Sequence, residues 1–278
     1  MRRMFAPALA AALVFAAAAH AQEPWPQRPV TIIVPFAAGG SADLLARILQ
    51  QHLQVKFGVP FVVENKSGAG GSIGTGFVAK APADGYTLLV GTVSSIAINA
   101  FLYTKLNFDV ARDLQPVSLL VRFPNLLFVN TKTPVRSVPE LIGYLKANNG
   151  KTNYGSSGIG TSSHLSSVMF ELAINTKMTH VPFRSTAAPD LPTIGETLKG
   201  YEATAWQGLF APAGTPRPIL DKIAAEVRGV WALPEVVTAL KNVGAEPAAS
   251  SPDEFTAYTA AERVRWGEVV KASGVKID

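Results

Sequence analysis

The chain has 278 residues, enough for one large domain or two modest ones, and its formal net charge of +5 is small for that length. It contains no block of like charges, so the sequence gives no electrostatic indication of a nucleic-acid-binding protein. It also contains no cysteine, which excludes a disulfide framework and a lipid-modified N-terminal cysteine. A hydrophobic core must therefore hold the fold together.

The first 21 residues have the pattern of a secretory signal peptide. Arg2 and Arg3 form a basic start, an apolar run follows, and Ala19-His20-Ala21 has the small-x-small form of a cleavage site. The apolar run is too short for a membrane span. We expect cleavage after Ala21 and a periplasmic protein. Without Arg2 and Arg3, 23 of the 25 basic residues remain against 20 acidic ones, a nearly balanced charge.

Strands and helices alternate after this segment. Short apolar runs predict strands at 30–34, 61–64 and 86–90, and leucine and isoleucine at helical spacing predict a helix over 44–53. A second helix is expected after the glycine-rich segment 67–74, ending near Lys80. Strand–helix–strand alternation predicts parallel pairing and an α/β layer fold.

A second block begins near Pro124. We expect strands at 126–129, 153–155 and 178–182, and helices that begin after Ser137 and near Ser162. The final third is predicted to be helical. Ser251-Pro-Asp-Glu254 has the form of a capping box and opens a long amphipathic helix to about Ala272.

Three loops, at 37–42, 67–74 and 156–163, share one design: each follows a strand, is rich in Gly and Ser, and precedes a helix. Glycine lets backbone N–H groups turn inward, and a helix N-terminus adds free donors and partial positive charge. None of the three carries Lys or Arg. The pattern favours a neutral site for an anion that is held and released, a carboxylate above all. Phosphate is less favoured because no Walker or dinucleotide-binding glycine motif is present.

Enzymatic interpretations have weaker support. Gly70-Gly-Ser-Ile-Gly74 matches G-x-S-x-G, but Ser72 lies well beyond the preceding strand, where a nucleophile elbow would not be. Ser156 and Ser162 lie near His164 in sequence without an elbow pattern. A serine hydrolase that uses Ser72, Ser156 or Ser162 with His164 remains an alternative. The histidines show no metal-binding spacing, and no cofactor is expected. We expect Trp206 and Phe210 to be core residues, with stacking on a ligand as the alternative.

The sequence resembles the Bug-type extracytoplasmic solute receptors of tripartite tricarboxylate transporters, from about Trp25 to the end. The matching stretches are WPQRPVTIIVPFAAGGSADLLAR, VVENKSGAGGSIGTGFVAKAPADGYTLL, NYGSSGIGTSSHL, THVPFR and GLFAPAGTPRPILDKIAAEV. The resemblance implies an α/β, two-lobed periplasmic-binding-protein-like (flytrap) fold that closes on a small organic carboxylate. It also implies a non-enzymatic receptor that serves membrane transporter subunits or a sensor, and we expect a monomer.

The resemblance also implies the ligand-binding positions. In one lobe these are Phe36, Gly39, Gly40, Ser41 and Asp43, with Ser94 and Ser95 nearby; in the other they are Ser156, Gly160, Thr161 and Ser162. The role of Asp43 is left open between a charge at the start of a helix and a residue that fixes the loop or pocket water. Ile96, Ala100 and Ile159 replace more typical family residues and make the pocket mouth less polar, which slightly favours a ligand with an apolar body.

The largest departure from the family follows Arg184. There the sequence passes directly into a segment that normally lies about 40 residues further on, after two strands and the helices between them. We expect residues 1–21 to be a signal peptide, residues 22–123 to form the first lobe with 211–278 packed back on it, and residues 124–210 to form a shortened, incomplete second lobe. A degenerate relative with impaired binding is therefore a further alternative.

Overall fold

The computed structural model describes residues 25–156, 158–182, 197–198 and 203–278. The predicted signal peptide and the discontinuity after Arg184 lie outside the described residues. In the described ranges, no helix has the length and apolar character needed to cross a membrane.

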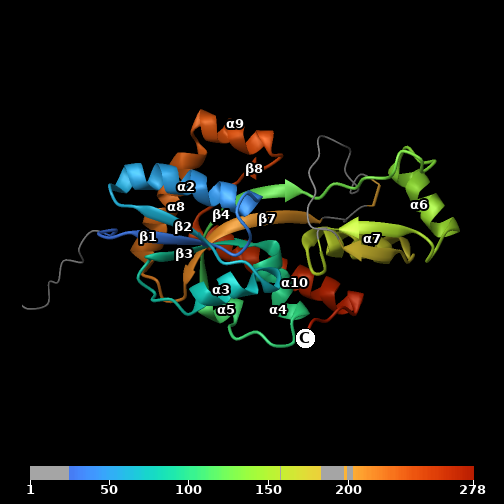
Figure 1. Ribbon diagram of the computed structural model, residues 1–278, viewed down its shortest axis with the longest axis horizontal. Helices are drawn as coiled ribbons and strands as arrows, with labels where there is room; N and C mark the ends of the chain where they lie inside the picture. Colours follow the sequence, from blue (N-terminus) through green and yellow to red (C-terminus); the bar gives the residue numbers. More distant parts are fainter. Residues whose placement is uncertain (1–24, 157, 183–196, 199–202) are drawn as a thin grey trace, which may run out of the picture.

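A mixed six-stranded sheet with the strand order β2-β1-β3-β7-β4-β8 is the centre of the molecule (Figure 1). Its strands are β1 (Val30–Val34), β2 (Phe61–Asn65), β3 (Thr87–Thr92), β4 (Leu114–Pro124), β7 (Thr204–Pro212) and β8 (Glu246–Pro247). As predicted from the alternating pattern, β1 is parallel to both β2 and β3. By contrast, β7 is antiparallel to β3 and β4, and β8 is antiparallel to β4. We call this sheet and its helices the large unit.

Helices cover both faces of this sheet. One face carries α2 (Ser41–Phe57), α8 (Arg217–Trp231) and α9 (Pro234–Asn242). The other carries α3 (Ser72–Ala79), the π-helical segment η3 (Ser94–Ile98), α4 (Asn99–Leu102) and α10 (Pro252–Ser273). The short elements η2 (Ala69–Gly71) and α5 (Val110–Asp113) complete this unit.

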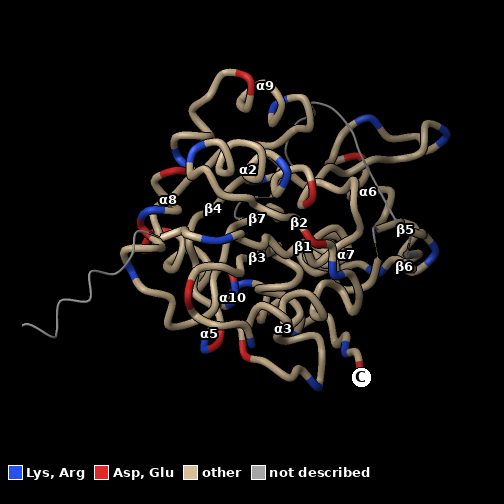
Figure 2. Tube along the Cα trace, turned by 60° about the vertical axis from the view of Figure 1, so that its left-hand side comes forward, with Lys and Arg blue, Asp and Glu red and all other residues tan. Residues whose placement is uncertain are grey.

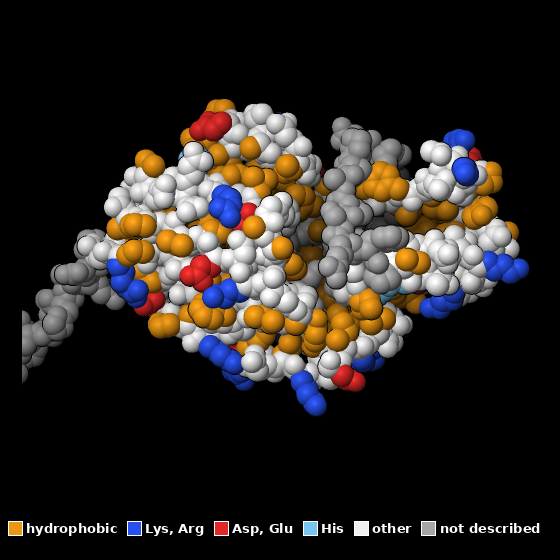
Figure 3. All heavy atoms as spheres, in the orientation of Figure 1, with side chains coloured by type: hydrophobic (Ala, Val, Ile, Leu, Met, Phe, Trp, Pro, Cys, Tyr) orange, Lys and Arg blue, Asp and Glu red, His pale blue; other side chains and the backbone are white. Residues whose placement is uncertain are grey.

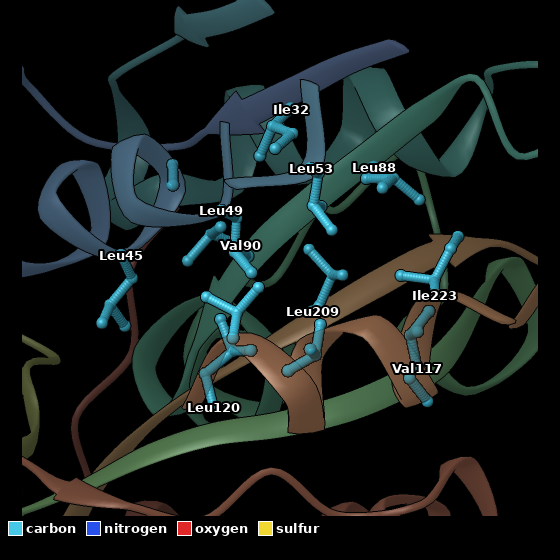
Figure 4. Close-up of a cluster of buried hydrophobic side chains, with 14 of the residues drawn as sticks. Ile32, Leu45, Leu49, Leu53, Leu88, Val90, Val117, Leu120, Leu209 and Ile223 are labelled. Carbon is cyan, nitrogen blue, oxygen red and sulfur yellow. The ribbon is translucent and has the colours of Figure 1, made fainter. Parts of the chain in front are cut away.

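The face under α2 holds a dense hydrophobic core (Figure 4). Leu45, Leu49 and Leu53 recur at helical spacing along α2, and each is at most 1% exposed. Their side chains belong to one cluster with Val90 of β3 and Leu209 of β7. This apolar stripe fixes the rotation and position of α2, so its N-terminus is held at the carboxyl end of β1.

The two helices that follow β1 and β2 leave the sheet on opposite faces. The buried side chains of α2 belong to one core, and Val78 of α3 belongs to the other. The crossover direction therefore changes beside β1, and in open α/β sheets such a point leaves a crevice at the carboxyl ends of the strands where ligands bind. The loop 35–40 lies at this position.

A smaller unit extends from the far ends of β4 and β7 (Figure 1). It contains α6 (Val138–Ala147), β5 (Asn153–Ser156), α7 (Ser162–Ile174) and β6 (Thr179–Pro182), with β5 and β6 in a parallel two-stranded sheet. Its own core cluster consists of Val135, Leu141, Leu145, Phe170 and Ile174. Leu165 and Val168 of α7 instead join the core beneath α10, so part of this unit packs against the large one.

The strand predicted at 126–129 is wrong. The structure ends β4 at Pro124 and leaves Leu126 to Val129 without regular structure. Leu127, Phe128 and Val129 are 38%, 52% and 41% exposed, and Figure 3 shows hydrophobic side chains at the surface of this end of the molecule. The β-prone, apolar character of these residues suggested a strand, but in the described residues they pair with no other strand.

The predicted capping box at the start of α10 is confirmed. The Ser251 side chain accepts from the Glu254 backbone N–H while the Glu254 carboxylate accepts from the Ser251 backbone N–H.

Farther along α10, the fully buried Glu262 accepts hydrogen bonds from Trp206 Nε1 of β7 at 2.8 Å and from Trp266 Nε1 at 3.0 Å. Trp206 and Phe210 are thus core residues, 0% and 1% exposed, as expected.

Candidate ligand-binding site

The loop after β1 is shaped by the carboxylate of Asp43. This group accepts from the Gly39 backbone N–H at 3.0 Å, from Asn65 Nδ2 at 3.1 Å and from Arg47 at 2.8 and 3.2 Å. Asn65 also donates to the Phe36 carbonyl at 3.0 Å, which ties β2 to the loop. The hydrogen bond from Arg47 lowers the pKa of Asp43 despite its burial, so the group is ionised near neutral pH.

These contacts favour the loop-fixing role for Asp43. Its side chain is 4% exposed and both carboxylate oxygens are already engaged by protein donors. An anionic ligand would gain little from direct contact with a carboxylate whose oxygens are already occupied. Gly39, at φ 85°, adopts the left-handed conformation that glycine tolerates best, so the loop needs glycine there. Asn65 was not recognised in the sequence as part of this network.

The N-terminus of α2 has no side-chain cap. Gly40 is its N-cap residue in an extended conformation, and it has no side chain to accept from the first-turn N–H groups. Gly39, Gly40 and Ser41 are exposed. A 17-residue helix with an open N-terminus presents backbone donors and partial positive charge to an anion.

Gln207 of β7 is the main residue that sequence reasoning missed. Its Nε2 donates to Ser41 Oγ at 2.6 Å, and its side chain lies on the α2 side of the sheet next to Thr92 of β3. Gln207 is only 7% exposed, yet its Oε1 has no hydrogen-bond partner. The available signal was a glutamine between apolar residues of β7, near the end of that strand that leads to the small unit.

The two serines predicted after β3 differ in their surroundings. Ser95 is fully buried; its hydroxyl accepts from the Thr92 N–H at 3.1 Å, and its own N–H donates to Thr92 Oγ1 at 3.3 Å. Ser95 therefore closes the turn after β3, and its direct contact with a ligand is not supported. Ser94, its neighbour, is half-buried.

The loop after β5 forms a second polar cluster. Ser156 Oγ lies 2.6 Å from His180 Nε2 and accepts from the Gly158 N–H at 3.1 Å. Thr161 caps α7 by accepting from the His164 N–H at 3.4 Å, and its hydroxyl donates to the Gly158 carbonyl at 2.7 Å. Ser162, in the first turn of α7, donates to Asn125 Oδ1 at 3.4 Å.

Gly160 brings this second cluster against the large unit. It has φ 75°, and a Cβ placed there would lie 2.2 Å from Leu102 Cδ2 of α4. Only glycine allows the loop to approach α4 this closely. The predicted residues therefore lie in two groups, at the N-terminus of α2 in the large unit and at the N-terminus of α7 in the small one.

The predicted pairing of Ser156 with His164 is wrong. Ser156 contacts His180, whereas His164 accepts from the Gly160 N–H through Nδ1 at 3.2 Å and stacks on His180 with ring centroids 4.1 Å apart. Ser72 accepts from Asn99 Nδ2 at 3.0 Å. Ser156 is 1% exposed, so its oxygen is not presented to solvent as a nucleophile would be.

The stacked histidines predict a pH-dependent stability. Burial, followed by the neighbouring His180, lowers the pKa of His164 to about 4. Because an unfolded histidine titrates near its ordinary value of about 6.5, the unfolded state binds a proton first as the pH falls. The free energy of unfolding should therefore fall between pH 6.5 and about 4 and be regained above pH 6.5.

Urea denaturation between pH 7 and pH 5, where most carboxylates stay ionised, measures this effect. His164→Phe keeps an aromatic ring in the stack but cannot titrate, so its stability should change less over that range. The stabilising ionisation of Asp43 is lost only below its ordinary pKa of 3.8, outside this window. Equal slopes in the wild type and the variant would contradict the assignment to His164.

A cavity of about 700 Å³ lies between α10 and the C-terminal segment, and none of its lining residues belongs to either cluster. It is lined by Phe101, Val264, Val270 and the basic residues Arg263, Lys271 and Lys276, among others.

In the described ranges no group of three or more His, Asp or Glu side chains is placed to hold a metal ion. Figure 2 shows basic and acidic residues interspersed along the chain rather than gathered into one field.

Comparison with known proteins identifies the family. The sequence matches the tripartite tricarboxylate transporter family receptor, TctC, over residues 45–188 and 183–275. It is 31% identical to a UPF0065 protein of Pseudomonas sp. strain P51, covering 97% of this chain and 93% of that one. It is also 31% identical to protein BugT of Bordetella pertussis, covering 94% of both. The chain belongs to the TctC family of tripartite tricarboxylate transporter receptors.

Solved structures agree with this assignment. R. palustris Rpa4515 with adipate has a TM-score of 0.80 at 33% identity, covering 91% of this chain and 99% of that one. MatC from Rhodopseudomonas palustris with bound malate has a TM-score of 0.75 at 30% identity, covering 88% and 100%. The family consists of solute-binding proteins rather than enzymes, and the α/β fold predicted from the sequence is confirmed.

The alignments also support a shortened chain. The alignment with the Pseudomonas protein extends over 314 residues, whereas 97% of this 278-residue chain is about 270, so about 44 aligned positions have no residue here. The family match is split into two segments that meet at residues 183–188. The incomplete second lobe expected from the discontinuity after Arg184 stays a prediction.

Proposed function

We propose that this protein is a periplasmic receptor for a small organic carboxylate, which it passes to a membrane transporter or a sensor. The observation that carries the proposal is the open N-terminus of α2, with Gly39, Gly40 and Ser41 exposed at the carboxyl end of β1. Backbone donors without a Lys or Arg suit a carboxylate that must be released again. The relatives described with adipate and malate support this ligand class.

The loop at the N-terminus of α7 supplies the other half of the proposed site. Gly158, Gly160 and Thr161 place backbone groups and a hydroxyl on the small unit. β4 and β7 lead from one unit to the other, which is where a hinge would lie. We propose that the two units act as lobes that close over the carboxylate, and that residues 1–21 direct export and are removed.

Thermal and chemical denaturation with candidate ligands tests this function. A carboxylate at 100 times its Kd should raise the free energy of unfolding by about 2.7 kcal/mol, because it binds only the folded state. The panel should contain mono-, di- and aromatic carboxylates, with the matching amides as uncharged controls. Calorimetry on the same panel gives the affinity directly.

The outcomes separate the alternatives. If no carboxylate binds this chain while R. palustris Rpa4515 binds adipate under the same conditions, the chain is a binding-impaired relative and the receptor proposal fails. Recovery of binding after insertion of the relative's segment at Arg184 would assign the defect to the missing residues. Labelling of Ser156 by a fluorophosphonate would instead support the hydrolase alternative.

A further inference from the structure

We infer that Gln207 makes the site selective for carboxylates with a hydroxyl group next to the carboxylate. The inference rests on the proposed function, because it concerns the same site at the N-terminus of α2. It begins from the Gln207 side chain, which is more than nine-tenths buried and leaves Oε1 without a partner. Buried acceptors are rarely left unpaired in folded proteins, so this oxygen requires an explanation.

The nitrogen and the oxygen of the Gln207 amide have different surroundings. Nε2 donates to Ser41 Oγ at 2.6 Å, so the Ser41 hydroxyl has its own proton available for an acceptor elsewhere. Oε1 is bonded to the same carbon as Nε2 and so lies close to the Ser41 contact. Consider a ligand carboxylate whose oxygen accepts from Ser41 and from the first-turn amides of α2. The ligand atoms next to that carboxylate would then lie close to Oε1.

Among the described residues, no donor forms a hydrogen bond with this oxygen. Gln207 pairs with Thr92 of β3 and Val121 of β4 in the sheet. Its neighbour in the sheet, Thr92, has its hydroxyl 3.5 Å from Ser95 Oγ. A ligand that enters the site can supply the hydrogen bond.

The missing partner defines the ligand class. An ionised carboxylate has only acceptors, so a plain carboxylic acid would leave Oε1 unpaired when it displaces water. A 2-hydroxy carboxylate places a donor one carbon from the carboxylate. An ammonium group would also donate, but the partial positive charge at the N-terminus of α2 disfavours a cation there, and the Asp43 charge is already paired with Arg47.

Matched pairs of acids test the inference by calorimetry on the purified protein. The pairs are malate and succinate, lactate and propionate, and 2-hydroxyglutarate and glutarate, which differ by one hydroxyl. We expect at least one pair to show about tenfold tighter binding of the hydroxy acid, the effect of one otherwise unpaired buried acceptor. Gln207→Met keeps the length of the side chain without an acceptor and should reduce that ratio to about threefold or less, mainly by weakening the hydroxy acid.

The control variant is Gln54→Met, an exposed position farther along α2, which should leave the ratio unchanged. Equal binding of both members of every pair that binds would overturn the inference while leaving the proposed function standing. An unchanged ratio in Gln207→Met would also overturn it. Absence of binding by all six acids would overturn the inference, whereas absence of binding across the whole carboxylate panel would overturn the proposed function. The wild-type ratio needs no variant, so the test does not depend on Gln207→Met folding.

Discussion

Replacing Ser41 with proline is expected to weaken carboxylate binding by at least about 100-fold while α2 remains folded. Ser41 is the first residue of α2, where proline is tolerated because that N–H has no partner within the helix. Gly40 already has φ −81° and ψ 174°, the extended conformation that a residue before proline adopts. The variant therefore removes a backbone donor and a hydroxyl without a helical distortion, and each hydrogen bond to a charged group contributes about 1.5–3 kcal/mol.

Ser41→Ala is the matched control because it removes the hydroxyl and keeps the N–H. It should weaken binding by about tenfold, so the difference between the two variants isolates the backbone donor. Both should lose about 1 kcal/mol of stability, since Gln207 Nε2 loses its acceptor in each. Calorimetry measures the affinities and urea denaturation the stabilities. Equal affinities for Ser41→Pro and the wild type would place the ligand away from the N-terminus of α2.

Replacing Glu262 with leucine is expected to destabilise the protein by about 3–5 kcal/mol, the largest stability effect we predict. The carboxylate is 1% exposed and accepts from two indole N–H groups, those of Trp206 and Trp266, which are themselves fully buried. Leucine leaves both donors unpaired inside the core and removes the ion pair of Glu262 Oε1 with Arg265 Nη1 at 3.1 Å. Glu262→Gln keeps one oxygen as an acceptor and should cost less, about 1–2 kcal/mol.

Glu268→Leu is the control on the same helix because Glu268 is exposed, and it should change stability by no more than about 0.5 kcal/mol. Urea denaturation followed by tryptophan fluorescence gives the comparison. A loss below 1 kcal/mol for Glu262→Leu would mean that the contact between β7 and α10 does not hold the two elements together as described.

Features encoded by neighbouring residues were predictable from the sequence. The parallel strands β1, β2 and β3 follow from apolar runs between helical patterns, and the start of α10 follows from its capping box. The positions of Gly39, Gly40 and Ser41 at an open helix N-terminus follow from the glycine-rich loop itself. Local sequence carries the information in each of these cases.

Features that depend on distant residues were not predictable. Gln207 meets Ser41 across 166 positions, and that contact exists only because β7 lies next to β3 in the sheet. Likewise, Asp43 could be assigned to the loop only once Asn65 was known to reach it from β2. The strand expected at 126–129 failed because an apolar, β-prone run needs a pairing partner that its own sequence does not reveal.

The small unit packs partly on the large one. Among the described residues, its own core cluster has five buried hydrophobic side chains, and Leu165 and Val168 of α7 join the core beneath α10 instead. We therefore propose that packing against the large unit holds the loop at the N-terminus of α7, the small unit's part of the proposed site, in position. The contact between Gly160 and Leu102 lies at this junction.

Amide chemical shifts recorded during titration with a carboxylate test this account most directly. With a ligand found by the thermal screen, the N–H signals of Gly39, Gly40, Ser41, Gly158 and Gly160 should shift along one saturation curve with a single Kd. That result would place both loops on the same bound molecule. Saturable shifts confined to residues around Phe101 and Lys271, with the two glycine-rich loops unchanged, would contradict it.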